Sequence, residues 1–180
     1  MLGDLCALID MGNVTSVDDQ SDIEITVDSG AGDTVAPPTA FPWAEVKPSE
    51  KSKRGAGYLG AGGERIANLG ELSTVLGVEG GPFAKFRFQA ANVRKPLLSV
   101  SASNDKGNMV IFDEDGSFIL PKGTAELKAI RALIRNAKLK IPLKRKNGVF
   151  TMTARRADRA RPRQQQRDGQ QPGFPGPGRG

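Results

Sequence analysis

The segment from Val27 to Ala31, Val-Asp-Ser-Gly-Ala, places one carboxylate among small residues. Before it, Ile23, Ile25 and Val27 alternate with polar residues, which predicts a half-buried strand that stops at Asp28. A carboxylate held at a strand end can serve as a general acid or base. Peptide hydrolysis without a covalent nucleophile or a metal needs two such groups around one water. The ionised group takes the proton of the water, and the protonated group donates to the scissile carbonyl.

The composition excludes most other catalytic chemistries. The 180 residues contain no His and only one Cys, Cys6. These counts exclude disulfide frameworks, zinc sites built on His or paired Cys, and catalytic units of the Ser–His or Cys–His type. The acidic run Asp113-Glu114-Asp115 lies in one predicted turn and is interpreted as a charged turn, not as a cation site. We therefore expect neither a metal nor another cofactor.

One chain offers one carboxylate of this kind, because no second Asp-Ser/Thr-Gly occurs. Asp115-Gly116-Ser117 has these residue types in the wrong order. Two carboxyl groups about 3 Å apart share a proton and titrate as a coupled pair. A two-fold axis through the site would bring Asp28 of two subunits together. The sequence therefore predicts a homodimer.

We expect the chain to have three parts, which differ in charge and in composition. Residues 155–180 hold seven Arg and two acidic residues, whereas residues 1–154 hold 19 basic and 18 acidic residues. We expect an acidic, disordered leader over 1–20, a folded domain over 21–154, and a disordered Arg/Gln/Gly/Pro-rich tail over 155–180 that could bind nucleic acid. No secretory signal and no apolar run of about 18 residues occurs, so we expect an intracellular, cytoplasmic protein without a membrane partner.

The predicted elements are mainly β-strands. Tyr58-Leu59 and Ile66 flank the sequence Gly60-Ala61-Gly62-Gly63-Glu64, which predicts a hairpin with a mobile tip. Further paired strands are predicted over Leu69–Val78 with Phe83–Ala90, Met109–Phe112 with Phe118–Leu120, and Ile141–Lys144 with Val149–Thr153 across the turn Asn147-Gly148.

Helices are expected at two places. Leu97-Leu98-Ser99-Val100 is interpreted as a strand end that leads into a short helical stretch. Thr124 can cap a helix over 124–139, because apolar residues recur at helical spacing after it. The basic residues between them are interpreted as a solvated helix face.

The eight residues from Asp28 to Val35 closely resemble the catalytic segment of retroviral proteases, the retropepsins. The order of predicted elements from Ile23 to Leu120 is similar to that of the retropepsin chain. The stretches Val93–Ser101, Gly107–Phe112 and Asn147–Phe150 are similar to the protease portion of Copia-type retrotransposon polyproteins. The resemblance covers residues 23–153. It implies a mainly β, retropepsin-like closed barrel or sandwich with a short helix, an inserted helix near 124–139, and a retrotransposon-derived origin.

The resemblance also implies an aspartic endopeptidase that cleaves a polypeptide substrate, with Asp28 as the catalytic residue. The residues that would support the active site are Ser29, Gly30, Ala31, Thr34, Leu97, Leu98 and Ser99. At position 99 the retropepsin pattern has a glycine, and this sequence has a serine. The hairpin Tyr58–Ile66 corresponds to a flap, and the last hairpin would supply the dimer sheet. Substrate contacts are expected from Asp33, Gly60, Ala61, Gly62 and Gly63.

Two other interpretations concern the glycines and the tail. The string from Gly55 to Gly60 matches the dinucleotide fingerprint GxGxxG, but it runs into more glycine and not into a helix, so flap flexibility explains it better. The alternative to an enzyme is an inactive polyprotein module that binds protein or nucleic acid through its basic tail.

Overall fold

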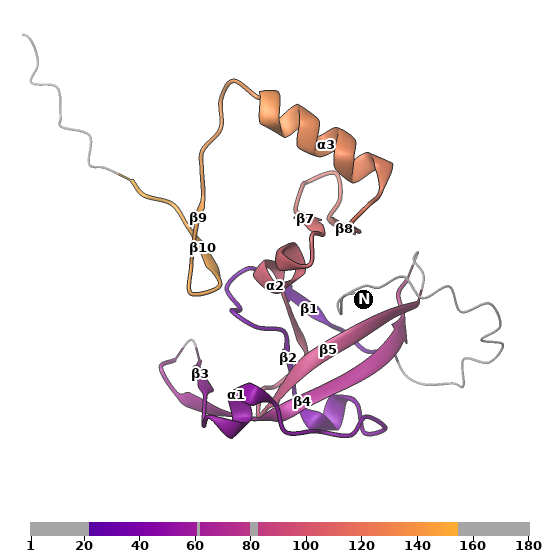
Figure 1. The fold of residues 1–180 in the computed structure, drawn as a ribbon, viewed down its shortest axis with the longest axis vertical. Coiled ribbons are helices and arrows are strands. Elements are labelled where there is room, and N and C mark those ends of the chain that lie inside the picture. Colours follow the sequence, from indigo (N-terminus) through magenta and orange to yellow (C-terminus); the bar gives the residue numbers. More distant parts are fainter. Residues whose placement is uncertain (1–21, 61, 80–82, 155–180) are drawn as a thin grey trace, which may run out of the picture.

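The computed structural model describes residues 22–60, 62–79 and 83–154. Six strands form one curled sheet, a half-barrel, in the spatial order β1–β6–β2–β5–β4–β3 (Figure 1). Their bounds are β1 Thr26–Asp28, β2 Val35–Ala36, β3 Gly57–Leu59, β4 Arg65–Gly77, β5 Phe83–Ala91 and β6 Leu97–Ser99. The expected mainly β class is confirmed. The sheet is open, however, with β1 and β3 as its edges among the described residues.

The long antiparallel pair β4–β5 carries the core. Its side chains alternate between buried and exposed, so Leu72 on β4 and Phe88 on β5 point inward as a cross-strand pair. The ring of Phe41 stacks on Phe88 with 4.9 Å between centroids. The buried cluster comprises Ala36, Phe41, Leu72, Ala84, Phe86, Phe88 and Ala90. This core holds β4 and β5 together, and the shorter strands pair beside them.

A bulge bends β4 between Asn68 and Gly70. Gly70 has φ 142°, and a Cβ there would lie 2.4 Å from the carbonyl oxygen of Lys47. Only glycine permits this approach, which lets Lys47 pair with Glu71. The bulge lies within the β4–β5 ladder, shortly after the residues of β4, 65–67, that pair with β3.

The segment that contains Asp28 connects β1 to β2, and these two strands lie on either side of β6. β1 pairs in parallel with β6, with Asp28 beside Ser99. The chain then leaves the sheet and returns as β2, which lies on the other side of β6 and is parallel to β5. The loop between β1 and β2, residues 29–34, therefore passes over the end of β6.

Four short helical segments accompany the sheet: the 3₁₀ segment Pro38–Ala40, α1 Glu50–Lys53, α2 Val100–Asp105 and α3 Ala125–Asn136. The predicted helices after Ser99 and after Thr124 are confirmed, although α3 ends at Asn136 and not at residue 139. The Thr124 hydroxyl accepts from the backbone N–H of Leu127, as expected of an N-cap. The 3₁₀ segment and α1 lie between β2 and β3, where the sequence predicted no helix or strand.

Two further hairpins follow the sheet. β7 (Met109–Ile111) and β8 (Phe118–Leu120) pair as predicted. The prediction of a strand over Ile141–Lys144 was wrong, because β9 is Lys144–Lys146 and pairs with β10, Val149–Thr151. Asn147 and Gly148 have φ 52° and 81°, so a two-residue turn pairs the residues directly beside it and leaves 141–143 outside the ladder.

The predicted leader, residues 1–20, and the predicted tail, residues 155–180, lie outside the described residues. So does Ala61 at the tip of the Gly-rich hairpin. Among the helices that the structure describes, none is long and apolar enough to cross a membrane.

Candidate active site

Asp28 ends β1, and its partly exposed side chain lies at the start of the loop 29–34. The backbone N–H of Gly30 donates to Asp28 Oδ1 over 2.7 Å. A Cβ at residue 30 would lie 3.2 Å from the same oxygen, so the position has little space for a side chain. From the described residues, no other hydrogen bond reaches this carboxylate, which leaves Oδ2 open to solvent, substrate or a second subunit.

Ser99 holds the loop that follows Asp28. Its fully buried hydroxyl donates to the carbonyl oxygen of Ala31 over 2.6 Å, and its backbone N–H donates to Thr34 Oγ1 over 3.2 Å. Because the one hydroxyl hydrogen of Ser99 is used there, the Ser101 hydroxyl is the donor in the 3.0 Å contact between the two oxygens. Ser99 also caps α2 by accepting from Ala102 N–H. One side chain thus joins the loop, the strand end and the helix.

Most of the predicted support residues come together around this loop. Leu98 and Thr34 are buried, and Leu97 pairs with β1 on one side and β2 on the other. Ser29 is exposed, and its hydroxyl has no hydrogen-bond partner among the described residues. Thr34, Leu97, Leu98 and Ser99 thus lie together around the loop that follows Asp28.

Asp33 is held by a lysine that sequence reasoning missed. Lys51 Nζ on α1 lies 2.6 Å from Asp33 Oδ1 and 2.5 Å from Oδ2. The Asp33 side chain is 26% exposed and that of Lys51 is 51% exposed, so solvent reaches the pair. The only local signal was the Ser49-x-x-Ser52 capping pattern, which starts α1 and thereby places Lys51.

Tyr58, on the first strand of the Gly-rich hairpin, lies beside Asp33. Burial, together with the negative charge and hydrogen-bonding carboxylate of Asp33, raises the pKa of the Tyr58 phenol well above its ordinary value, against an opposing hydrogen bond from Asn68. Asn68 Nδ2 donates to Tyr58 Oη over 3.0 Å. The phenol oxygen is therefore an acceptor from Asn68, and its ionisation would place a second negative charge beside Asp33.

The same amide continues the network into the sheet. Asn68 Nδ2 donates to Gln89 Oε1 over 2.9 Å, and the Ser49 hydroxyl donates to that oxygen over 3.1 Å. The network ties α1, the hairpin and β5 together. No sequence signal marked Asn68 or Gln89, because their partners are 10 to 40 residues away along the chain.

The predicted Gly-rich hairpin is confirmed as β3 with the start of β4, in which Tyr58 pairs opposite Ile66. At its tip, Gly60 N–H donates to Glu64 O and Gly63 N–H donates to Gly60 O, each over 2.9 Å. Gly63 has φ 86°, which glycine adopts without strain. Among the described residues, no hydrogen bond joins Gly60, Gly62 or Gly63 to Asp28, and the hairpin approaches the Asp28 loop at Tyr58, beside Asp33.

The turn between β9 and β10 packs on the Asp28 loop. A Cβ at Gly148 would lie 2.6 Å from Gly32 Cα, and a Cβ at Gly32 would lie 3.3 Å from Asn147 O. Arg145 on β9 donates from both of its terminal nitrogens to the Asp105 carboxylate, over 2.7 Å for Nη2 to Oδ2. These hydrogen bonds lower the pKa of Asp105. The hairpin is therefore fixed at its turn and at α2.

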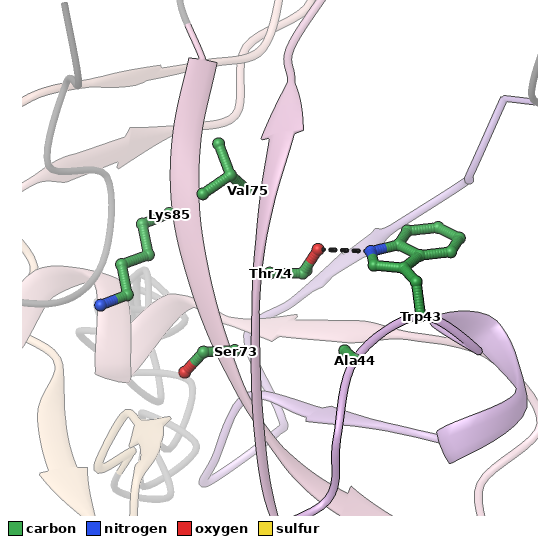
Figure 2. A pocket seen from close by; sticks show the side chains of 6 residues that line it. All are labelled: Trp43, Ala44, Ser73, Thr74, Val75 and Lys85. Carbon is green, nitrogen blue, oxygen red and sulfur yellow. Dashed lines mark hydrogen bonds between the residues drawn. The ribbon is translucent and has the colours of Figure 1, made fainter. Parts of the chain in front are cut away.

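Two shallow depressions lie away from Asp28. One, of about 340 Å³, is bordered by Trp43, whose indole N–H donates to Thr74 Oγ1 over 3.0 Å (Figure 2). The other, of about 330 Å³, lies beside α1. The lining of the first is Trp43, Ala44, Ser73, Thr74, Val75 and Lys85, without a carboxylate. Neither depression contains a residue of the loop 29–34.

Among the described residues, no group of three or more Cys, Asp or Glu side chains is placed to hold a metal ion. Comparisons of the chain with protein-family models, with curated proteins and with solved structures found no match. Function is therefore inferred from the residues around Asp28.

Proposed function

We propose that this chain is a retropepsin-like aspartic endopeptidase that works as a homodimer, each subunit contributing Asp28. The observation that supports this most is the setting of Asp28. Its carboxylate stands at a strand end, accepts one backbone hydrogen bond from Gly30, and has an open second oxygen among the described contacts. The loop beside it is clamped by the buried hydroxyl of Ser99, which makes the position of the carboxylate rigid.

In this proposal, the two Asp28 carboxyl groups share one proton and hold a water between them. The ionised group takes a proton from the water, whose oxygen adds to the scissile carbonyl carbon while the protonated group donates to the carbonyl oxygen. The C–N bond then breaks as the amide nitrogen takes the proton that the first carboxyl group had gained, while the other, now ionised, carboxylate takes a proton from a hydroxyl of the tetrahedral intermediate. A carboxylic acid and an amine leave, and the pair again holds one proton. Ser29, which is exposed next to Asp28, would form a hydrogen bond across the two-fold axis.

The substrate would lie between the loop 29–34 and the Gly-rich hairpin. Asp33, with its partly exposed carboxylate, and the small residues Gly60, Ala61, Gly62 and Gly63 would contact the peptide. The network through Tyr58 supports this arrangement, because it links the hairpin to the loop. The hairpin would act as a flap that closes over the peptide and excludes water.

The second subunit would cover apolar surface near the last hairpin. Leu139, Ile141 and Leu143 are 89%, 72% and 60% exposed, and they lead directly into β9. The hairpin turn itself touches Gly32 of the Asp28 loop. A second copy that packs on this segment would bury these side chains close to the site.

Asp28→Asn in the full-length chain tests the proposal. With an unfolded protein as substrate, we expect pepstatin-sensitive cleavage by the parent chain and a loss of about 10²–10⁴-fold or more in the variant, because amide nitrogen cannot act as acid or base. Asp115→Asn, in an exposed turn, is the matched control and should retain full activity. Unchanged cleavage in the Asp28 variant would exclude this residue as the catalyst.

A mixing experiment tests the shared site. Adding excess Asp28→Asn chains to a fixed amount of parent chains should lower activity, because mixed dimers hold only one competent carboxylate. Sedimentation across concentration should show a dimer under the same conditions. Activity that is unaffected by the inactive chains, or a strictly monomeric active protein, would contradict a site built by two subunits.

A further inference from the structure

The C-terminal part of the described chain is strongly basic. Residues 121–154 contain nine Lys and Arg and one acidic residue, Glu126, for a net charge of +8. Residues 22–120, which include the half-barrel, contain ten basic and 13 acidic residues, for a net charge of −3. The basic character of the protein is thus not confined to its last 26 residues, and α3 with the β9–β10 hairpin carries much of it.

On α3, the basic side chains form one stripe. Lys128, Arg131 and Arg135 follow each other at spacings of three and four, so they share one side of the helix and span about 10 Å along its axis. All three residues are exposed. Leu127, one turn before Arg131, lies at the edge of this stripe and is only 1% exposed, so the helix rests on protein along that edge while the three basic residues stay exposed.

The three basic side chains of β9 do not all point the same way, because successive residues of a strand point to opposite faces. Arg145 points toward α2 and pairs with Asp105, so Lys144 and Lys146 point to the opposite face. Both lysines are exposed. Lys138 and Lys140 lie between helix and hairpin, and Lys140 Nζ donates to the last-turn carbonyl of Arg135. Among the described carboxylates, none pairs with Lys128, Lys138, Lys144 or Lys146.

We propose that α3 and the β9–β10 hairpin bind the phosphate backbone of nucleic acid, a function separate from peptide cleavage. Exposed cations without carboxylate partners bind a polyanion favourably, because each contacted phosphate releases condensed counterions. Phe150, the one aromatic residue in 121–154, is half-buried and offers no stacking platform for bases. Binding is therefore through charge and is independent of base sequence.

An anionic lipid surface fits these observations less well. A membrane-surface helix must bury its whole apolar side in the headgroup region. In α3 that side is partly used inside the protein, because Leu127 is buried. Arg131 is also tied to the body by a 2.9 Å hydrogen bond to Gly107 O. The outward lysines of β9, moreover, lie on a separate element from the helix.

The test compares three full-length variants that each lose four positive charges. The surface variant changes Lys128, Arg135, Lys144 and Lys146 to Gln. The body control changes Lys53, Arg54, Arg65 and Arg94 to Gln, and the tail control changes Arg155, Arg156, Arg159 and Arg161 to Gln. Circular dichroism checks that each variant folds, and all positions changed in the first two variants are exposed.

Fluorescence anisotropy with single- and double-stranded DNA of arbitrary sequence gives the affinity at several salt concentrations. We expect the surface variant to bind at least tenfold more weakly than either control. Its slope of log affinity against log salt for duplex should be shallower by about 3 to 4, at ~0.9 for each phosphate that is no longer neutralised. Equal weakening in all three variants, weakening confined to the tail control, or no binding by the parent chain would overturn the proposal. So would tighter binding to phosphatidylserine vesicles than to DNA.

Discussion

The hydroxyl of Ser99 donates a 2.6 Å hydrogen bond to the carbonyl oxygen of Ala31 and thereby joins the end of β6 to the loop that follows Asp28. The hydroxyl oxygen of Ser99 also accepts from Ala102 N–H at the start of α2. In a retropepsin-like pattern a glycine would stand here, so the bond is a feature that the serine adds.

Ser99→Ala should lower the free energy of unfolding by about 1–3 kcal/mol, because a carbonyl and a helix N–H lose their partner in a buried place. Urea unfolding measures this. Ser73→Ala, at an exposed position of β4, is the control and should stay within about 0.5 kcal/mol of the parent chain. If the proposed function holds, kcat should fall as well, since the Asp28 loop is no longer clamped. Equal stability of both variants would contradict the role given to Ser99.

The contact of Gly148 with Gly32 leads to a second prediction. Gly148→Ala should cost more stability than a positive φ alone explains, because the added methyl would lie 2.6 Å from Gly32 Cα and push the turn off the loop. Gly55→Ala is the matched control, with φ 67° and nothing within 4 Å of its Cβ. We expect about 1 kcal/mol for the control and a clearly larger loss for Gly148→Ala. Thermal or urea unfolding compares the two, and equal losses would show that the turn does not pack on the loop.

Local signals in the sequence were sufficient for the elements that depend on local interactions. Asn147-Gly148 fixes a two-residue turn, and the Thr124 side chain fixes the start of α3. The loop support from Leu98 and Ser99 was also predicted, through the resemblance of the motif. The wrong bounds of β9 came from following apolar residues where the turn alone sets the register.

Elements that depend on distant partners could not be predicted. β2 has only two residues and exists because β5 and β6 pair with it on either side. Lys51 meets Asp33 only because the chain folds α1 against the half-barrel, and the two residues are 18 positions apart in the sequence. Asn68 and Gln89 likewise belong to the candidate site through a network that spans three elements.

Tyr58 is the single tyrosine of the chain, so its ionisation can be followed directly by near-ultraviolet absorbance. Its pKa in the folded protein is raised above the ordinary value of 10.0, first by burial and then by Asp33. Above pH 10.0 the unfolded chain therefore ionises before the folded chain, and stability falls as pH rises toward the higher pKa. Tyrosinate absorbance should appear together with alkaline unfolding.

Asp33→Asn should bring the ionisation of Tyr58 to lower pH, since the neighbouring negative charge is removed. Asp105→Asn makes the same substitution on α2, away from the Tyr58 phenol. In this variant Tyr58 should ionise at the same pH as in the parent chain. An identical shift in both variants, or none in either, would mean that Asp33 does not act on Tyr58. The lysine that pairs with Asp33 would remain near the phenol in the first variant and add to the expected decrease.

The pair formed by Arg145 and Asp105 gives a prediction at acid pH. The hydrogen bonds from Arg145 hold the pKa of Asp105 below its ordinary value of 3.8. The stabilisation is therefore complete above that value and is lost as pH falls through the lower pKa of the folded state. The side chains of Arg145 and Asp105 are 37% and 57% exposed, so solvent and salt screen the pair and its contribution is small. The protection of the β9–β10 amides, measured by hydrogen exchange relative to the intrinsic rate at each pH, should fall in the parent chain as pH falls through this range. In Asp105→Asn the protection should be lower throughout and should change less with pH. Asp113→Asn, in the turn between β7 and β8, should behave like the parent chain. Exchange in the Asp105 variant that matches the parent at every pH would show that the ion pair does not hold the hairpin.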